Sequence, residues 1–261
     1  MKAIRDDSAS GRFYVIGTQR YPSVTHILQA IGKPALVNWA ASTERTLVSE
    51  TAADLYHDVA QILPPLPRAM FLTTLLTRLG KVRAHQRELE QAATIGSQAH
   101  ALVEWNLRKM IGPQLAPEPR VSVDAARAFG HFQAWADSVH LRPVRIEETV
   151  WSDTYQYAGT MDLLANVDHR LMLIDFKTSK AVYQEALLQN VAYQVALAEM
   201  GHGTPDGGLI VRLPKLASDP TFEVVTVPPV DELLPVFLAA RQIWQWWHAA
   251  EEAYRAKQAA G

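Results

Sequence analysis

The chain contains no cysteine among its 261 residues. Disulfides, thiolate zinc sites, iron–sulfur clusters and cysteine nucleophiles are therefore excluded together. Any bound metal must be held by oxygen or histidine ligands. The chain also has no Gly-x-x-x-x-Gly-Lys-Ser/Thr segment, the loop with which many nucleotide hydrolases cradle phosphates. We therefore expect no nucleotide cofactor.

Long apolar runs and a strong net charge are missing as well. No run approaches the ~18 apolar residues of a membrane span, and the opening MKAIRDDSASGRFYVIG has no apolar core of signal-peptide length. We therefore expect a cytoplasmic protein. The net charge of -2 gives no overall attraction to nucleic acid. Residues 68–109 nevertheless carry seven Lys or Arg against three Glu, which fits either a solvated helical face or a surface that follows phosphates.

The hydrophobic pattern predicts mostly helices in the first half and strands mixed with helices in the second. Helical periodicity predicts helices over 38–62, 68–79, 81–110, 122–140, 184–200 and 231–257, and a brief helix that Ser23 or Thr25 caps. Apolar runs predict strands over 12–18, 144–151, 159–167, 171–177, 209–213 and 222–227. This order predicts one compact α/β unit, a sheet flanked by helices with an N-terminal helical elaboration.

Charged residues gather around the predicted strand 171–177. Asp175 and Lys177 alternate with apolar residues and therefore project from one face. Asp162 lies on the neighbouring strand, which is otherwise apolar, so its carboxylate must be neutralised, paired or bound to metal. One interpretation pairs Asp162 with Lys177 and leaves Asp175 exposed. The other makes both acids ligands of a divalent cation for phosphodiester hydrolysis, with Lys177 orienting or deprotonating water.

The arrangement resembles the PD-(D/E)XK nuclease superfamily, in which one strand carries an acid and the next an Asp-x-Lys or Glu-x-Lys triplet. Gly-Thr-x-Asp at 159–162, Ile-Asp-Phe-Lys-Thr-Ser-Lys at 174–180 and Gln-x-x-x-Tyr at 189–193 are similar to its RecB-like exonuclease branch. Gly96 and His100 resemble that branch's Gly-x-x-x-His helix. Tyr21-Pro22-Ser23-Val24-Thr25, with Trp39, resembles the opening of phage exonucleases and the mitochondrial genome maintenance exonuclease.

The resemblance implies a restriction-endonuclease-like α/β fold with a central mixed sheet. It implies a single nuclease domain over 1–261, in which a helical subdomain at 40–140 covers the site and guides a strand along its basic side. The catalytic core sheet with its helix would occupy 144–230, and a C-terminal helix 231–261.

The resemblance also implies roles for individual residues. The expected catalytic residues are Lys177, Asp162, Asp175, Glu147, Gln189 and Tyr193. The expected metal ligands are His100, Asp162, Asp175 and the backbone carbonyl of Phe176, with Mg2+ or Mn2+ as the ion.

Some of these assignments leave alternatives open. Glu147 and Glu148 point to opposite faces, and we favour Glu147. Gln189 and Tyr193 share a helical face, where they either hold the strand or Lys177 or are ordinary surface polar residues. Thr178 and Lys180 are candidates for phosphate contacts.

The function that the resemblance implies is a metal-dependent deoxyribonuclease, an exonuclease on single-stranded DNA or DNA ends in phage or bacterial recombination or repair. A recombination or single-strand-binding protein is the partner class to expect. Without a phosphate-binding loop, the chain is not a self-contained helicase–nuclease. Three alternatives stay open: a structure-specific or restriction-like endonuclease, a catalytically inactive nuclease-fold DNA-binding protein, and an RNA-processing nuclease.

The tryptophans near the C-terminus allow two interpretations. They could stack on bases, or they could belong to a helix that packs on the core. We favour packing, because apolar residues recur there at helical spacing: Leu233, Phe237, Ile243 and Trp247.

Overall fold

The computed structural model describes residues 3–8, 11–32, 34–60, 67–81, 83–113 and 116–259. The chain divides into two compact units: residues 32–94 form one, and residues 1–31 with 95–261 form the other. The prediction that a helical region at 40–140 covers the site therefore crosses the boundary between units and stays a prediction.

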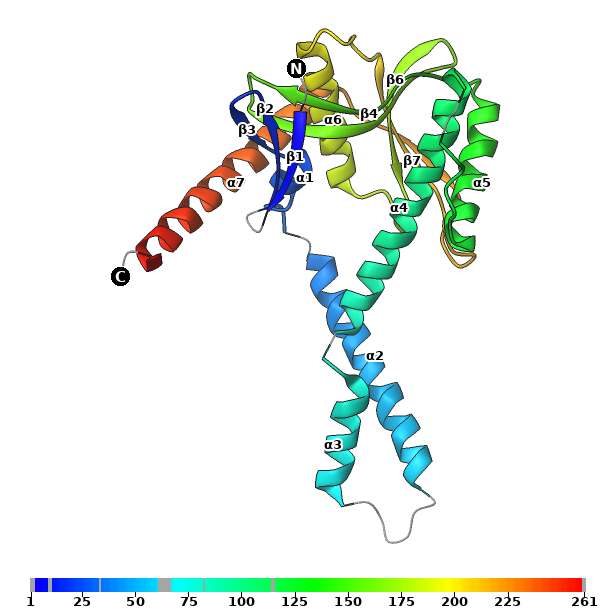
Figure 1. Cartoon of the computed structure of the whole chain (residues 1–261), viewed down its shortest axis with the longest axis vertical. Coiled ribbons are helices and arrows are strands. Elements are labelled where there is room, and N and C mark those ends of the chain that lie inside the picture. Colours follow the sequence, from blue (N-terminus) through cyan, green and yellow to red (C-terminus); the bar gives the residue numbers. More distant parts are fainter. Residues whose placement is uncertain are drawn as a thin grey trace. The chain divides into compact units, whose positions relative to one another are not determined.

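A five-stranded mixed sheet forms the centre of the larger unit (Figure 1). The strands lie in the order β4 (Arg142–Ser152), β5 (Tyr157–Val167), β6 (Arg170–Lys177), β7 (Gly207–Arg212) and β8 (Glu223–Thr226). Strands β6 and β7 run parallel and the other neighbours antiparallel. Because parallel strands need a crossover, the helix α6 (Gln184–Glu199) connects β6 to β7. Strands β5 and β6 form a hairpin, and its turn residues Asp168 and His169 both have positive φ.

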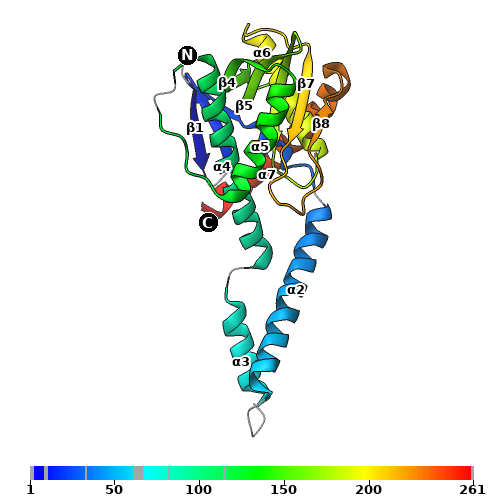
Figure 2. The same ribbon diagram turned by 90° about the vertical axis from the view of Figure 1, so that its right-hand side faces the viewer.

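Helices cover both faces of this sheet (Figure 1, Figure 2). On one face, α5 (Val123–Ser138) and the part of α4 (Ala84–Ile111) after Thr94 pack against Leu163 and Ile174. On the other face, α1 (Val24–Leu28), α6 and α7 (Val230–Ala259) pack against Leu164 and Leu173. Neighbouring residues of β5 and β6 thus serve opposite layers, as the two-residue period of a central strand requires.

A second, three-stranded antiparallel sheet corrects the expectation for the N-terminus. The strand predicted over 12–18 is β2 (Gly11–Ile16), which ends at a two-residue turn where Gly17 has φ +63°. It pairs on either side with strands that the pattern did not predict, β1 (Ala3–Ser8) and β3 (Gln19–Pro22). These strands are short and carry exposed polar residues, so their apolar period is weak. Ser23 caps α1 by accepting a hydrogen bond from the His26 N–H.

Each face of this N-terminal sheet has its own packing partner. Tyr14, Ile16 and Tyr21 on one face form a buried cluster with Ala158 of β5. Phe13 on the other face contacts the rings of His26 in α1 and Trp244 in α7. The N-terminal sheet is therefore an integral layer of the larger unit.

The smaller unit consists of α2 (Pro34–Val59), α3 (Arg68–Leu79) and the first part of α4. Helix α3 coincides with its predicted range, and Gly80, with φ +70°, follows it. Helix α2 begins earlier than predicted, and its predicted end near residue 62 lies outside the described residues. An ion pair joins Arg78 to Asp58 at 2.7 Å, and a hydrogen bond joins His85 Nδ1 to Glu44 Oε1 at 2.8 Å, so that α2 is linked to α3 and to α4.

Helix α7 contradicts the expectation that packing accounts for its aromatic residues. Phe237 is buried and Trp244 is partly buried, but Ile243, Trp246 and Trp247 are 48%, 68% and 47% exposed. The helix extends past the core (Figure 1), and its residues from 249 to 258 are exposed. None of the helices within the described ranges combines the length and apolar composition needed to cross a bilayer.

Candidate active site

Three potential ligands from three elements converge beside β6: His100 of α4, Glu147 of β4 and Asp162 of β5. One ligand atom from each lies within 4.8 Å of the others, and His100 Nδ1 is 3.6 Å from Asp162 Oδ2. All three side chains are half-buried. Imidazole with carboxylates is a donor set suited to divalent cations such as Mn2+. The structure thus groups Glu147 with two of the predicted ligands, and we call these three residues the metal set.

An unusual backbone conformation at Glu147 places its side chain beside the other two residues of the metal set. Its φ is +49°, a region that residues other than glycine seldom adopt. Ile146 packs in the α4/α5 layer and Val150 in the α6 layer, although regular alternation would put both on one face. In β5, Met161 and Leu163 differ in the same way. In both strands, the face on which side chains of one parity lie therefore reverses between the pairs Ile146–Leu163 and Glu148–Met161. Glu147 and Asp162 lie at this reversal.

Lys177 belongs to a second group of polar residues. Its Nζ is 2.6 Å from Asp175 Oδ2 and donates a hydrogen bond to Gln189 Oε1 at 3.2 Å. Gln189 Nε2 in turn donates to the Tyr193 hydroxyl at 3.2 Å. The Asp175 side chain is only 3% exposed. The interpretation that pairs Lys177 with Asp162 and leaves Asp175 exposed is therefore wrong.

The backbone of Phe176 joins the two groups. Its N–H donates to Asp162 Oδ2 at 2.8 Å, so a residue between Asp175 and Lys177 orients the carboxylate of the metal set. The predicted role of the Phe176 carbonyl as a ligand stays a prediction. Asp175 also stays a predicted ligand, because among the described residues it lies outside the metal set.

Crowded carboxylates give the site its electrostatic character. Burial, together with the charges of Asp162 and Glu104, raises the pKa of Glu147 to about 8. Burial also raises the pKa of Asp175, against the opposing effect of Lys177. Burial lowers the pKa of Lys177, but the carboxylates of Asp175 and Asp162 outweigh this and leave it raised. These acids would ionise more readily beside a cation, so the residues present fit a divalent metal ion.

Two features hold α6 against the sheet. An added Cβ at Gly159 would lie 2.4 Å from the Tyr193 ring, so this ring rests directly on the β5 backbone. The buried Asn190 donates from Nδ2 to the Leu173 carbonyl of β6 at 3.1 Å and accepts from Gln194 at 2.9 Å. Gln189 and Tyr193 are thus fixed relative to Lys177.

Other predicted residues take different places. Glu148 bonds Arg145 and His202, away from the metal set. The Thr178 hydroxyl lies against Gly96 of α4, because a Cβ added at Gly96 would be 3.0 Å from it. Lys180 is exposed.

One contact near the site was not predicted. The Tyr14 hydroxyl lies 3.0 Å from Thr160 Oγ1, two residues before Asp162. The Gly-Thr-x-Asp motif could have identified Thr160 as a residue of the site. No sequence motif surrounds Tyr14, so no such signal identifies it.

A family model described as the PD-(D/E)XK nuclease superfamily matches residues 71–259. The chain belongs to this superfamily. Its five-stranded mixed sheet with helices on both faces is the restriction-endonuclease-like fold of PD-(D/E)XK proteins. The superfamily consists of nucleases that use divalent metals. In this PD-(D/E)XK protein, Asp175, Phe176 and Lys177 at the end of β6 have the Asp-x-Lys pattern, and their catalytic role stays a prediction.

Solved structures add more distant similarities. A protein from Eubacterium rectale provisionally named an exonuclease is similar with a TM-score of 0.36 and 10% identity, over 72% of this chain and 80% of that one. The protein SSO0001 is similar with a TM-score of 0.30 and 14% identity, over 59% of this chain and 73% of that one. A comparison with curated proteins found no significant match.

Proposed function

We propose that this protein is a metal-dependent deoxyribonuclease, an exonuclease that degrades single-stranded DNA or DNA ends in phage or bacterial recombination or repair. One observation carries the proposal. The metal set and the Asp175–Lys177 pair lie on either side of Phe176, whose N–H bonds Asp162. A cation site beside an ammonium group is a combination that can hydrolyse phosphodiesters, because both groups stabilise the negative charge that develops on the phosphate.

His100, Glu147 and Asp162 would hold the cation, with Asp175 beside them. A divalent cation supplies positive charge to a phosphoryl oxygen and lowers the pKa of water. Its binding requires Glu147 to release its proton, since only the carboxylate is a ligand.

Lys177 contributes charge and hydrogen bonds. Asp175 raises its pKa, so Nζ keeps its proton at neutral pH. The ammonium group therefore orients water and stabilises negative charge that develops on the phosphate, and deprotonating water is left to other groups. Gln189 and Tyr193 position it from α6.

The exonuclease assignment and the DNA preference are supported by the RecB-like motifs, Gly-Thr-x-Asp and Gln-x-x-x-Tyr. Phosphodiester hydrolysis itself needs neither a free end nor deoxyribose. The substrate assay must therefore separate an exonuclease from an endonuclease and DNA from RNA.

The test compares end-labelled linear single-stranded DNA with a covalently closed circle of the same sequence, in Mg2+ or Mn2+. We expect the linear strand to be degraded and the circle to persist. Asp175→Ala and Lys177→Ala should each lower the cleavage rate by about 1,000-fold or more, while calorimetry should show that Lys177→Ala still binds Mn2+. Asp168→Asn, at a carboxylate that is 65% exposed, is the matched control and should cleave normally.

Each other outcome rejects a defined part of the proposal. Cleavage of the circle would identify an endonuclease, and cleavage of RNA alone an RNA-processing enzyme. DNA binding without cleavage in either metal would identify a catalytically inactive DNA-binding protein. Normal cleavage by Asp175→Ala or Lys177→Ala would mean that the site is misplaced.

A further inference from the structure

Two arginines of the N-terminal sheet share one carboxylate. Arg5 of β1 contacts Asp7 Oδ2 through Nε and Nη2, each at 2.7 Å, and Arg12 of β2 contacts Asp7 Oδ1 through Nε at 2.8 Å. All three side chains are accessible, with 50%, 41% and 53% of Arg5, Arg12 and Asp7 exposed. Asp7 therefore holds two guanidinium groups side by side at the surface, and we call Arg5 and Arg12 the arginine pair.

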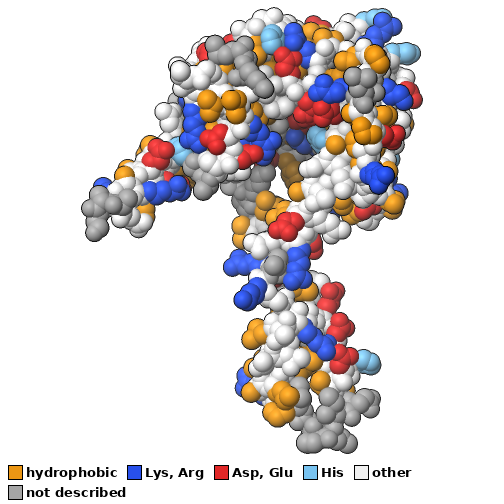
Figure 3. Space-filling model, in the orientation of Figure 1, with side chains coloured by type: hydrophobic (Ala, Val, Ile, Leu, Met, Phe, Trp, Pro, Cys, Tyr) orange, Lys and Arg blue, Asp and Glu red, His pale blue; other side chains and the backbone are white. Residues whose placement is uncertain are grey.

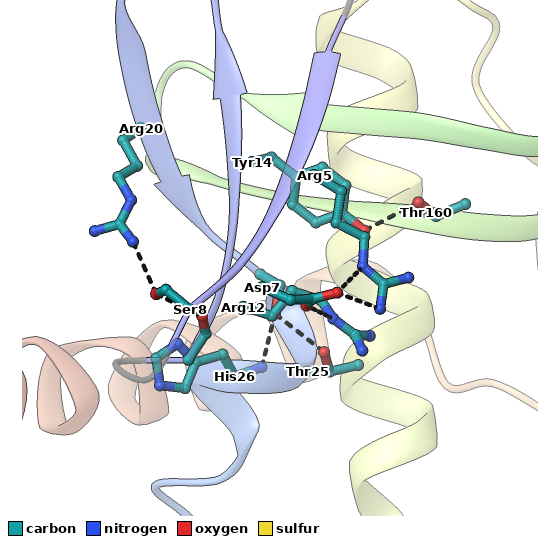
Figure 4. Close-up of polar contacts among 11 residues, drawn as sticks. Arg5, Asp7, Ser8, Arg12, Tyr14, Arg20, Thr25, His26 and Thr160 are labelled. Carbon is teal, nitrogen blue, oxygen red and sulfur yellow. Dashed lines mark hydrogen bonds and ion pairs between the residues drawn. The ribbon is translucent and has the colours of Figure 1, made fainter. Parts of the chain in front are cut away.

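The arginine pair lies on the face of the sheet that packs against the catalytic strands. In the β1–β2 register, Arg5 is opposite Tyr14 and Asp7 is opposite Arg12, so all four side chains share one face. On that face the Tyr14 hydroxyl bonds Thr160 of β5. Figure 4 shows both guanidinium groups on the same side of the sheet as this hydroxyl.

The strand directions extend this face toward Asp162. An isolated parallel bridge joins Ser23, which follows β3, to Ala158 of β5. Because β2 is antiparallel to β3, the step from Tyr14 back to Arg12 follows β5 forward from Thr160 to Asp162. In the space-filling view, Lys and Arg side chains gather over β1–β3 beside a hollow (Figure 3).

The charge and the donors of this pair fit an anion. Two guanidinium groups and one carboxylate leave one positive charge, and a guanidinium carries five N–H donors that match phosphate in bidentate geometry. Of the Arg12 guanidinium, Asp7 contacts only the Nε atom among the contacts of the described residues. Arg20, on the opposite face, differs because it bonds Asp6 and Ser8 and lies 3.6 Å over the Phe13 ring.

We propose that Arg5 and Arg12 bind a backbone phosphate of the nucleic-acid strand that occupies the metal set, with Asp7 keeping the two guanidinium groups together. The proposal rests on the proposed nuclease function. These residues precede the region that the family model matches, so the superfamily assignment does not account for them. A phosphate contact positions the strand without reading its sequence.

The test measures binding of a fluorescent single-stranded oligonucleotide by the Lys177→Ala protein over a range of salt concentrations. In that background, Arg5→Gln/Arg12→Gln should weaken binding about 10-fold for any sequence. It should also lower the slope of log K against log salt by about 0.7, the value for one phosphate of a single strand. In the cleaving enzyme, the same double variant should raise KM and leave kcat unchanged.

Two further variants separate charge, geometry and folding. Arg20→Gln removes one charge from the opposite face and should bind and cleave as wild type does. Arg5→Lys/Arg12→Lys should keep the salt slope but recover only part of the affinity, because an ammonium group lacks the planar fork. Thermal unfolding should be cooperative in every variant.

Failure of this inference is distinguishable from failure of the proposed function. If wild type cleaves DNA while the double Gln variant has wild-type KM, affinity and salt slope, the arginine pair binds no phosphate. An equal loss in Arg20→Gln would also overturn it, since it would indicate general charge attraction. If wild type neither binds nor cleaves nucleic acid, the proposed function itself fails.

Discussion

The position of the Lys177 ammonium group depends on small groups behind it. Gln189 accepts its hydrogen bond, Tyr193 accepts from Gln189, and the Tyr193 ring lies against the bare backbone of Gly159. The glycine of the Gly-Thr-x-Asp motif thus has a steric function. It lets α6 approach β5 closely enough for the hydrogen bonds to reach Lys177.

Gly159→Ala should therefore reduce both stability and cleavage. The new Cβ would lie 2.4 Å from the Tyr193 ring, and moving the ring should cost about 1–3 kcal/mol and displace Gln189. Urea unfolding and single-turnover cleavage rates measure the two effects. Gly130→Ala in α5, where an added Cβ meets nothing within 4 Å, is the matched control. Wild-type behaviour of Gly159→Ala would show that this glycine does not set the position of Tyr193.

The sequence identified many of these side chains as candidates for the site, but it did not predict the backbone conformation that orients them. The alternation of β6 correctly places Asp175 and Lys177 together, because that strand is regular. Glu147 could be favoured over Glu148 from sequence. The positive φ of Glu147 and the reversal of faces in β4 and β5 could not be predicted, because a two-residue period assumes a uniform strand. Tyr14 was missed because its contact with Thr160 spans 146 positions.

Strands and helices were predicted best where packing requires a clear period. The central strands, α3 and α6 have apolar residues at the spacing of their own geometry, and their existence followed from sequence. Strands β1 and β3 were missed because they pair locally through backbone bonds and present polar side chains. For helix α7 the sequence predicted too much packing, because its apolar period continues beyond the core on which the helix packs.

Helix α7 should therefore contribute stability from one part only. Phe237 is fully buried, with its ring centroid 5.0 Å from that of Tyr157, and Phe237→Ala should cost about 3–5 kcal/mol. Trp246 is 68% exposed, so Trp246→Ala should change stability by no more than about 0.5 kcal/mol. Equilibrium denaturation of both variants checks this. A comparable loss in Trp246→Ala would mean that the end of α7 packs on part of the protein.

The chain as a whole carries a pH dependence that originates in its site. Glu147 has a usual pKa near 4.5 and a folded pKa of about 8, and that of Asp175 is raised in the same direction, to about 6. Between the unfolded and folded values, the folded protein binds more protons than the unfolded chain. Stability of the metal-free protein must then fall as pH rises through this window.

Unfolding in the presence of a chelator should therefore show a lower Tm at pH 8 than at pH 6. Mn2+ should raise the Tm at both values and more at pH 8, because protons compete with the metal for Glu147. At about 100 times the Kd the gain should be about 2.7 kcal/mol. Glu147→Gln should flatten the pH dependence, and His100→Ala should reduce the gain from Mn2+. An identical gain from Mn2+ in His100→Ala would remove that residue from the metal set.

The bond between Asn190 and the Leu173 carbonyl has a consequence for how the chain tolerates insertions. A helix turns by about 100° per residue, so a residue added between Gln189 and Asn190 would rotate the Gln189 side chain away from Lys177. The residues between β6 and α6, 178–183, are not under this constraint, because Asn190 sets the rotation of the helix from within the core. We therefore expect engineered variants that differ in the length of this connection to keep the positions of Gln189 and Tyr193 relative to Lys177.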